Sequence, residues 1–210
     1  MNYYTMVLFV VMGILSSCST NSNSGTAATT TPVNHKPVYT NTSTTSNTGL
    51  RPMQKYYRST NTAIGATRIV IDKSDFELRV YDNKGLLAAY PVVFGLKPLE
   101  DKYMQGDRKT PEGTFKILYS KQHQLWKRML MLDYPTAESA TKFRVRKSNG
   151  LIPATASIGS GIGIHGVEPG NDFFIDRFYN WTNGCISLKN THIEDLAKYI
   201  KTGTPVSIQK

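Results

Sequence analysis

Residues 164–188 read IHGVEPGNDFFIDRFYNWTNGCISL, with a histidine near one end and a cysteine near the other. His165 and Cys185 can meet only if the chain doubles back between them. Pro169 and Gly170 favour a turn in this segment. The aromatic side chains that follow can bury against a core: Phe173, Phe174, Phe178, Tyr179 and Trp181. A histidine beside a cysteine is the minimum for thiol nucleophilic catalysis, because the imidazole takes the thiol proton and the thiolate attacks.

A lone cysteine is more often a small buried hydrophobe than a nucleophile. Two local features favour the nucleophile for Cys185. Gly184 directly precedes it and lets a backbone N–H approach a developing oxyanion closely. Residues 159–164 read GSGIGI, which predicts a strand that is approached closely on one face just before His165.

His165-Gly166 and the segment around Cys185 together resemble the motifs of the L,D-transpeptidases, the YkuD-like catalytic domains that act on bacterial peptidoglycan. In that family a histidine is followed, after a spacer, by Ser/Thr-His-Gly-Cys and a hydrophobic residue. The segment Thr182-Asn183-Gly184-Cys185-Ile186 matches this pattern except at Asn183, where the family usually has a second histidine. Ser187 also departs from the Asn or Arg that is common there. The sequence of the motif is similar to that of the YafK-like branch of the family, some of whose members catalyse hydrolysis rather than cross-linking.

A second stretch carries the same resemblance. Residues 107–115 read DRKTPEGTF, which is similar to the family's D-x-x-T-P-x-G-x-F stretch, and the resemblance extends from Arg68 to the C-terminus. It implies a mainly β fold, a YkuD-like sandwich of mixed sheets with one helix on its C-terminal side. It also implies an enzyme that needs no cofactor and forms an acyl-enzyme with peptidoglycan stem peptides.

The resemblance assigns the site residues as follows. Cys185 is the nucleophile, His165 moves the proton, and the carbonyl of Gly166 orients the imidazole. The backbone N–H groups of Asn183, Gly184 and Cys185 are the candidates for the oxyanion hole.

Three functions remain open at this point. The chain transfers the acyl group to an amine, or hydrolyses it, or is a wall-binding lipoprotein without turnover. The missing motif histidine at Asn183 keeps the second and third alternatives in view. An active Cys185 is expected to have a lowered pKa and to be alkylated quickly, whereas an inactive relic is expected to react slowly.

The N-terminus predicts export. Residues 1–17 contain an apolar run, Met6 to Leu15, that is too short to span a membrane comfortably and is typical of a signal peptide. Leu15-Ser16-Ser17-Cys18 resembles a bacterial lipobox, which makes Cys18 the lipidated residue and leaves Cys185 a free thiol. The alternative is an ordinary cleaved signal with an incidental cysteine. We expect a lipoprotein anchored to a membrane, facing the periplasm or cell wall.

Composition divides the rest of the chain into a tether and one domain. Residues 18–66 are rich in Ser, Thr and Asn and predict a disordered tether, and residues 67–210 predict the catalytic domain. Alternating patterns and turns predict strands at 67–72, 76–81, 86–94, 114–119 and 206–208, and a further strand at 143–146. Residues 191–194 predict the capping box of a helix that Gly203 and Pro205 end.

Charge and ligand spacing limit the partners. The formal net charge of +10 suits an acidic polymer, and an anionic cell wall is a simpler partner than nucleic acid, for which no binding motif is present. Lys102, Arg108 and Lys109 are expected to form a solvated face. No second histidine or cysteine stands at a metal-ligand spacing from His165 or Cys185, so no metal is expected. We expect a monomer.

Overall fold

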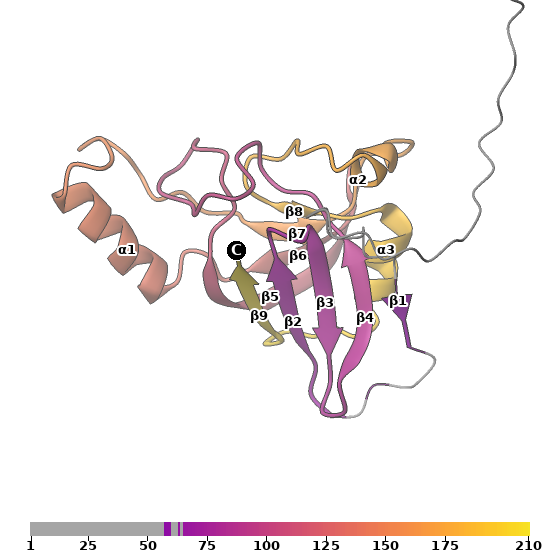
Figure 1. Cartoon of the computed structure of the whole chain (residues 1–210). Helices are drawn as coiled ribbons and strands as arrows, with labels where there is room; N and C mark the ends of the chain where they lie inside the picture. The colour runs from indigo at the N-terminus through magenta and orange to yellow at the C-terminus, as the bar shows by residue number, and fades with distance from the viewer. Residues whose placement is uncertain (1–56, 60–62, 64) are drawn as a thin grey trace, which may run out of the picture. The chain divides into compact units, whose positions relative to one another are not determined.

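A computed structural model describes residues 57–59, 63 and 65–210, and its fold is mainly β, as predicted (Figure 1). The strands are β1 (Tyr57–Arg58), β2 (Arg68–Asp72), β3 (Glu77–Tyr81), β4 (Leu86–Pro91), β5 (Gly113–His123), β6 (Lys127–Leu132), β7 (Gly163–His165), β8 (Ile186–Ser187) and β9 (Pro205–Gln209). The helices are α1 (Ala137–Ser148), α2 (Phe173–Asp176) and α3 (Asn190–Leu196).

These strands form one mixed sheet in the order β1-β4-β3-β2-β9-β5-β6-β7-β8. Two neighbouring pairs are parallel, β2 with β9 and β7 with β8, and the other pairs are antiparallel. The sheet curls until its two ends meet, because the chain after β4 returns to β8. Val93 and Ser187 exchange backbone hydrogen bonds of 3.0 and 2.8 Å, and Gly95 forms a bridge to Thr182. Figure 1 shows β6, β7 and β8 running across the upper ends of β2, β3 and β4.

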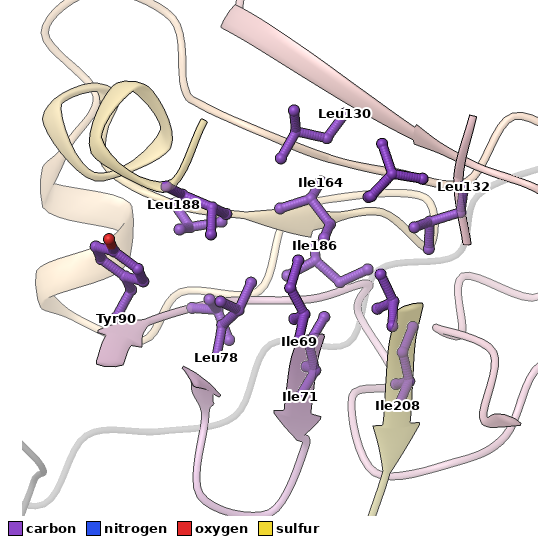
Figure 2. Packing of buried hydrophobic residues seen from close by; sticks show 14 of the residues in the cluster. Ile69, Ile71, Leu78, Tyr90, Leu130, Leu132, Ile164, Ile186, Leu188 and Ile208 are labelled. Atoms are coloured by element: carbon purple, nitrogen blue, oxygen red, sulfur yellow. The ribbon is translucent and has the colours of Figure 1, made fainter. Parts of the chain in front are cut away.

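The core fills the space inside this curl. Side chains from the two parts of the sheet face one another in Figure 2, with Ile164, Ile186 and Leu188 on one side and Ile69, Ile71 and Leu78 on the other. Each of these six side chains is at most 1% exposed. Burying a large aliphatic side chain contributes about 1.5–3 kcal/mol to the stability of the fold. The core therefore holds the strands next to the site motifs rigidly.

The predicted opening of the domain is confirmed. β2, β3 and β4 form an antiparallel meander, and the turn between β3 and β4 falls at 82–85 as expected. The Asp82 carboxylate accepts hydrogen bonds from the N–H groups of Lys84 and Gly85, and Gly85 has a φ of 142°. Glycine adopts this conformation without strain.

The boundary between tether and domain needs a correction. Tyr57 and Arg58, which we assign to the tether, pair with Ala89 and Ala88 as β1 at the edge of the sheet. Period-2 patterning does not reveal a strand of two exposed residues. The rest of the tether, except residues 59, 63, 65 and 66, lies outside the described residues, as do the signal peptide and Cys18.

The strand expected at 143–146 is wrong, because this segment lies within α1. Thr136 is the N-cap of α1, and its hydroxyl accepts a hydrogen bond from the Ser139 N–H. Glu138 in the first turn and Arg146 in the last complement the helix dipole. No residue of α1 is buried, so the helix has no apolar stripe to read in the sequence.

The predicted capping box at 191–194 is also wrong. α3 begins at Asn190 with Lys189 as N-cap, and Glu194 instead forms a bidentate pair with Arg128 of β6 at 3.1 Å. Within the described ranges, no helix combines the length and apolar character that crossing a membrane requires.

Candidate active site

The parallel pair β7–β8 brings the two ends of the sequence motif together. His165 is in register with Ser187, and Cys185 directly precedes β8. Partners in a parallel pair point to the same face, so Ser187 lies on the face that carries His165, and Cys185 precedes Ser187 by two residues. Strand spacing places the Cα atoms of Cys185 and His165 about 8 Å apart.

The imidazole of His165 is buried and held in one tautomer. Its exposed fraction is 2%, and its Nδ1 lies 2.7 Å from the carbonyl oxygen of Gly166. A carbonyl only accepts, so Nδ1 carries the proton and Nε2 keeps a lone pair. Burial lowers the pKa of His165 to about 4, against a smaller rise from the Gly166 hydrogen bond. His165 is therefore neutral at pH 7 and able to accept a proton at Nε2.

Two tryptophans enclose this imidazole. The ring of Trp126 is stacked on it with centroids 4.5 Å apart, and the edge of Trp181 meets it at 5.6 Å. His123 stacks on the other side of Trp126, also at 4.5 Å. Its Nδ1 accepts from the N–H groups of Leu125 and Trp126, which fixes the tip of the β5–β6 hairpin. The hairpin tip thus covers His165 and keeps water from it.

The thiol of Cys185 is partly accessible but closely surrounded. Its Sγ lies 3.6 Å from the carbonyl oxygen of Gly161. Burial raises the pKa of the Cys185 thiol, while the Gly163 N–H and the charge of Lys102 act in the opposite direction. Of the two outcomes that the sequence leaves open, a raised pKa is the one expected of a thiol that is alkylated slowly. Both members of the pair are neutral at rest, and the sequence alone could not weigh burial against charge.

The turn before Cys185 is built around Thr182. The Thr182 hydroxyl donates to the carbonyl of Cys185 at 2.7 Å and accepts from the Gly184 N–H at 3.1 Å. The N–H of Gly184 is thus already used, which leaves those of Asn183 and Cys185 as candidates for the oxyanion hole. Gly184 has a φ of +133°, and a Cβ there would lie 2.7 Å from the carbonyl oxygen of Lys109. Asn183 is exposed.

The TPEG stretch belongs to a loop that packs against this turn. Lys102, which we expected on a solvated face, is instead buried and pairs with Asp107 at 2.7 Å. The Asp107 carboxylate also accepts from three backbone N–H groups, those of Tyr103, Met104 and Lys109. The loop is therefore rigid where it meets Gly184.

A buried lysine that directly follows β2 anchors the same loop. The side chain of Lys73 is fully buried, and its Nζ lies 2.8 Å from Glu112. It also donates to the carbonyls of Glu100 and Thr110 at 2.8 and 3.2 Å. Sequence reasoning missed Lys73 and placed Lys102 in solvent, since a lysine carries no local signal of its burial partner.

No group of three or more His, Cys, Asp or Glu side chains in the described part of the chain could hold a metal ion.

A family model of the YkuD L,D-transpeptidase catalytic domain matches residues 66–208. The chain belongs to the L,D-transpeptidase catalytic domain family. This range includes β2 to β9 apart from the last residue of β9, and it contains both site motifs. A comparison with curated protein sequences found no match.

Several solved structures are similar to this L,D-transpeptidase domain. The helical cell shape determining protein Pgp2 from Campylobacter jejuni is 25% identical with a TM-score of 0.51, over 69% of this chain and 48% of that chain. A K307A mutant of the same protein is 23% identical with a TM-score of 0.52, over 69% of this chain and 47% of that chain. Bd1075 from Bdellovibrio bacteriovorus is 24% identical with a TM-score of 0.49, over 72% of this chain and 50% of that chain. The chain spans about half the length of these proteins.

Proposed function

We propose that this protein is a peptidoglycan L,D-transpeptidase with Cys185 as nucleophile and His165 as general base. The observation that supports the proposal is the register of β7 and β8, in which His165 pairs with Ser187, two residues after Cys185, while the Nδ1–H of His165 is bound to the Gly166 carbonyl. The fixed Nδ1 proton leaves Nε2 as the base.

The reaction follows from these positions. Nε2 of His165 takes the thiol proton while Sγ attacks the carbonyl carbon of the third residue of a stem tetrapeptide. The negative charge that develops on the carbonyl oxygen is met by the N–H groups of Asn183 and Cys185. The tetrahedral intermediate then breaks its C–N bond, and the imidazolium returns its proton to the leaving amine of D-alanine. An acceptor amine next attacks the thioester, forms an amide cross-link and restores the thiol.

Hydrolysis of the thioester is the second candidate. Asn183 is exposed at the position where the family usually has a histidine, and an amide cannot move a proton for an incoming amine. Water is a smaller acceptor that needs less orientation. The chain would then be an L,D-carboxypeptidase or would release a wall-linked protein. A non-catalytic wall-binding lipoprotein is the third alternative.

Defined muropeptides separate these outcomes. The purified full chain is incubated with a disaccharide tetrapeptide, and the products are read by mass spectrometry. Dimers indicate transfer, shortened stems indicate hydrolysis, and unchanged substrate refutes both reactions. Cys185→Ala is the matched control, because it removes the sulfur and keeps the backbone. A carbapenem adduct that forms on the wild type and not on Cys185→Ala would locate the nucleophile independently of the acceptor.

We also propose that the protein is exported and acts at the cell wall as a lipoprotein anchored through Cys18. The sequence of the first eighteen residues supports this, and so does the net charge of +10, which suits an anionic wall. Pgp2, which shares the fold, is described as a protein that determines helical cell shape. Metabolic labelling with a palmitate analogue tests the anchor, and Cys18→Ala should lose the label.

A further inference from the structure

The peptide unit between Gly166 and Val167 holds the catalytic imidazole from one side. Its carbonyl oxygen lies 2.7 Å from Nδ1 of His165 and also accepts from the hydroxyl of Ser187 at 3.2 Å. Its N–H, on Val167, donates to Oδ1 of Asn190 at 3.1 Å. The orientation of this one peptide plane therefore sets the direction in which Nδ1–H must point.

The preceding peptide is held as well. The N–H of Gly166 donates to the carbonyl of Trp126 at 3.0 Å. A Cβ at position 166 would overlap Oδ1 of Asn190 and would lie 2.7 Å from the Trp126 carbonyl oxygen. Gly166 is thus enclosed between the β5–β6 hairpin tip and the Asn190 side chain, and little room remains for its peptide to rotate.

Asn190 is itself fixed at the start of α3. Its backbone N–H donates to the Asp172 carboxylate at 3.0 Å, and Ile193 on the next turn is fully buried in the core. The side chain is partly buried, and its amide oxygen is aimed at the Gly166–Val167 peptide rather than at a backbone N–H of its own helix.

We propose that Asn190 is a positioning residue for His165, acting through the Gly166–Val167 peptide. The inference rests on the proposed role of His165 as base. Without an acceptor at position 190, the Val167 N–H loses its partner and the peptide tilts to find water. The Gly166 carbonyl then leaves the line of Nδ1–H, and Nε2 is no longer held toward the sulfur. Ser187 shares the same carbonyl but cannot hold the N–H side of the peptide.

Two variants with the same branching at Cγ test the proposal. Asn190→Leu removes the acceptor, whereas Asn190→Asp keeps an oxygen where Oδ1 stands. Thr191→Ala, at an exposed position on the same turn, is the control for α3 itself. For each full-length protein, the rate constant and the apparent affinity for acylation of Cys185 by imipenem are measured by mass spectrometry.

Asn190→Leu should lower the acylation rate constant by roughly 10- to 100-fold, as misplacing a catalytic group does, with little change in apparent affinity. Asn190→Asp and Thr191→Ala should retain most of the wild-type rate constant. In ¹⁵N NMR of histidine-labelled protein, the Nδ1–H tautomer of His165 should persist in Asn190→Asp and give way to a tautomer mixture in Asn190→Leu.

A wild-type rate and a single tautomer in Asn190→Leu would overturn the proposal. A folded Asn190→Asp protein that is acylated roughly 10-fold or more slowly than the wild type would also overturn it, and this comparison stands even if the leucine variant fails to fold. If the wild type neither reacts with imipenem nor alters muropeptides, the proposed function fails instead. The tautomer comparison still decides whether Asn190 positions the imidazole.

Discussion

Protonation of His165 should cost the folded protein about 3 kcal/mol of stability as the pH falls from about 6.5 to about 4. The imidazole is 2% exposed, and the carbonyl on Nδ1 and the stacked ring of Trp126 offer no counter-charge for an imidazolium. Burial therefore lowers the pKa of His165 from the ordinary 6.5 to about 4. Each pKa unit by which the folded state differs from the unfolded state corresponds to about 1.4 kcal/mol.

The direction of the effect follows from proton counting. Between the two pKa values the unfolded chain binds a proton at His165 that the folded chain does not. Lowering the pH through this window therefore favours unfolding, and the stability is fully present above about 6.5. The pKa of His192 is also lowered by burial, so His192 destabilises the fold in acid in the same direction.

His165→Gln isolates the contribution of His165, because glutamine cannot titrate and its amide can donate to the Gly166 carbonyl. Urea unfolding followed by tryptophan fluorescence is measured for both full-length proteins at several values from about pH 7.5 to about pH 4. The wild type should lose about 3 kcal/mol more than the variant over this range, with His192 contributing equally to both. Parallel curves would refute the reasoning, since they would mean that the imidazole titrates as if it were in water.

Three further substitutions probe the supports of the site. Lys73→Met should lower the free energy of unfolding in urea by about 3 kcal/mol, because it leaves Glu112 and two carbonyls without their buried partner, and Lys73→Met/Glu112→Gln should recover part of the loss. An unchanged midpoint in Lys73→Met would contradict this role. Gly166→Ala should abolish acylation by imipenem because its Cβ meets backbone at 2.7 Å, whereas Gly170→Ala, where nothing lies within 4 Å, should cost only about 1 kcal/mol of strain. Equal acylation rates in the two alanine variants would be evidence against the tight fit. Trp126→Ala should admit water to the catalytic imidazole and raise its pKa in an NMR titration, while Trp126→Phe keeps a stacked ring and most of the low pKa. No rise in Trp126→Ala would show that another group excludes the water.

The sequence predicted the parts of this domain that depend on local pattern. β2 and β3 alternate in sequence and in burial, and the turn between β3 and β4 contains Gly85, so both local signals agree with the structure. Of the strand expected at 159–164, only Gly163 and Ile164 lie in β7, where a side chain at 163 would meet Met129 and the β6 backbone.

The sequence failed where long-range burial or partners decide the outcome. Apolar and basic residues alternate in the segment 143–146, yet the segment lies in α1, which Thr136 caps and in which no residue is buried. Lys102 was expected in solvent because nothing local reveals that Asp107 would fold back onto it. The sequence did not predict the contact of Asn190 for the same reason, because its partner is a backbone N–H more than twenty residues away.

The neutral resting pair has a consequence for the reactivity of the Cys185 thiol. Burial lowers the pKa of His165 and raises that of Cys185, so an imidazolium–thiolate pair in the empty site would suffer desolvation at both members. Proton transfer becomes favourable only when a substrate carbonyl receives the negative charge and N–H groups of the 183–185 turn stabilise it. Oxidants attack the thiolate rather than the thiol, so a cysteine that rests protonated is protected from them. We therefore expect the same burial that slows alkylation of the free enzyme to preserve Cys185 until a stem peptide is bound.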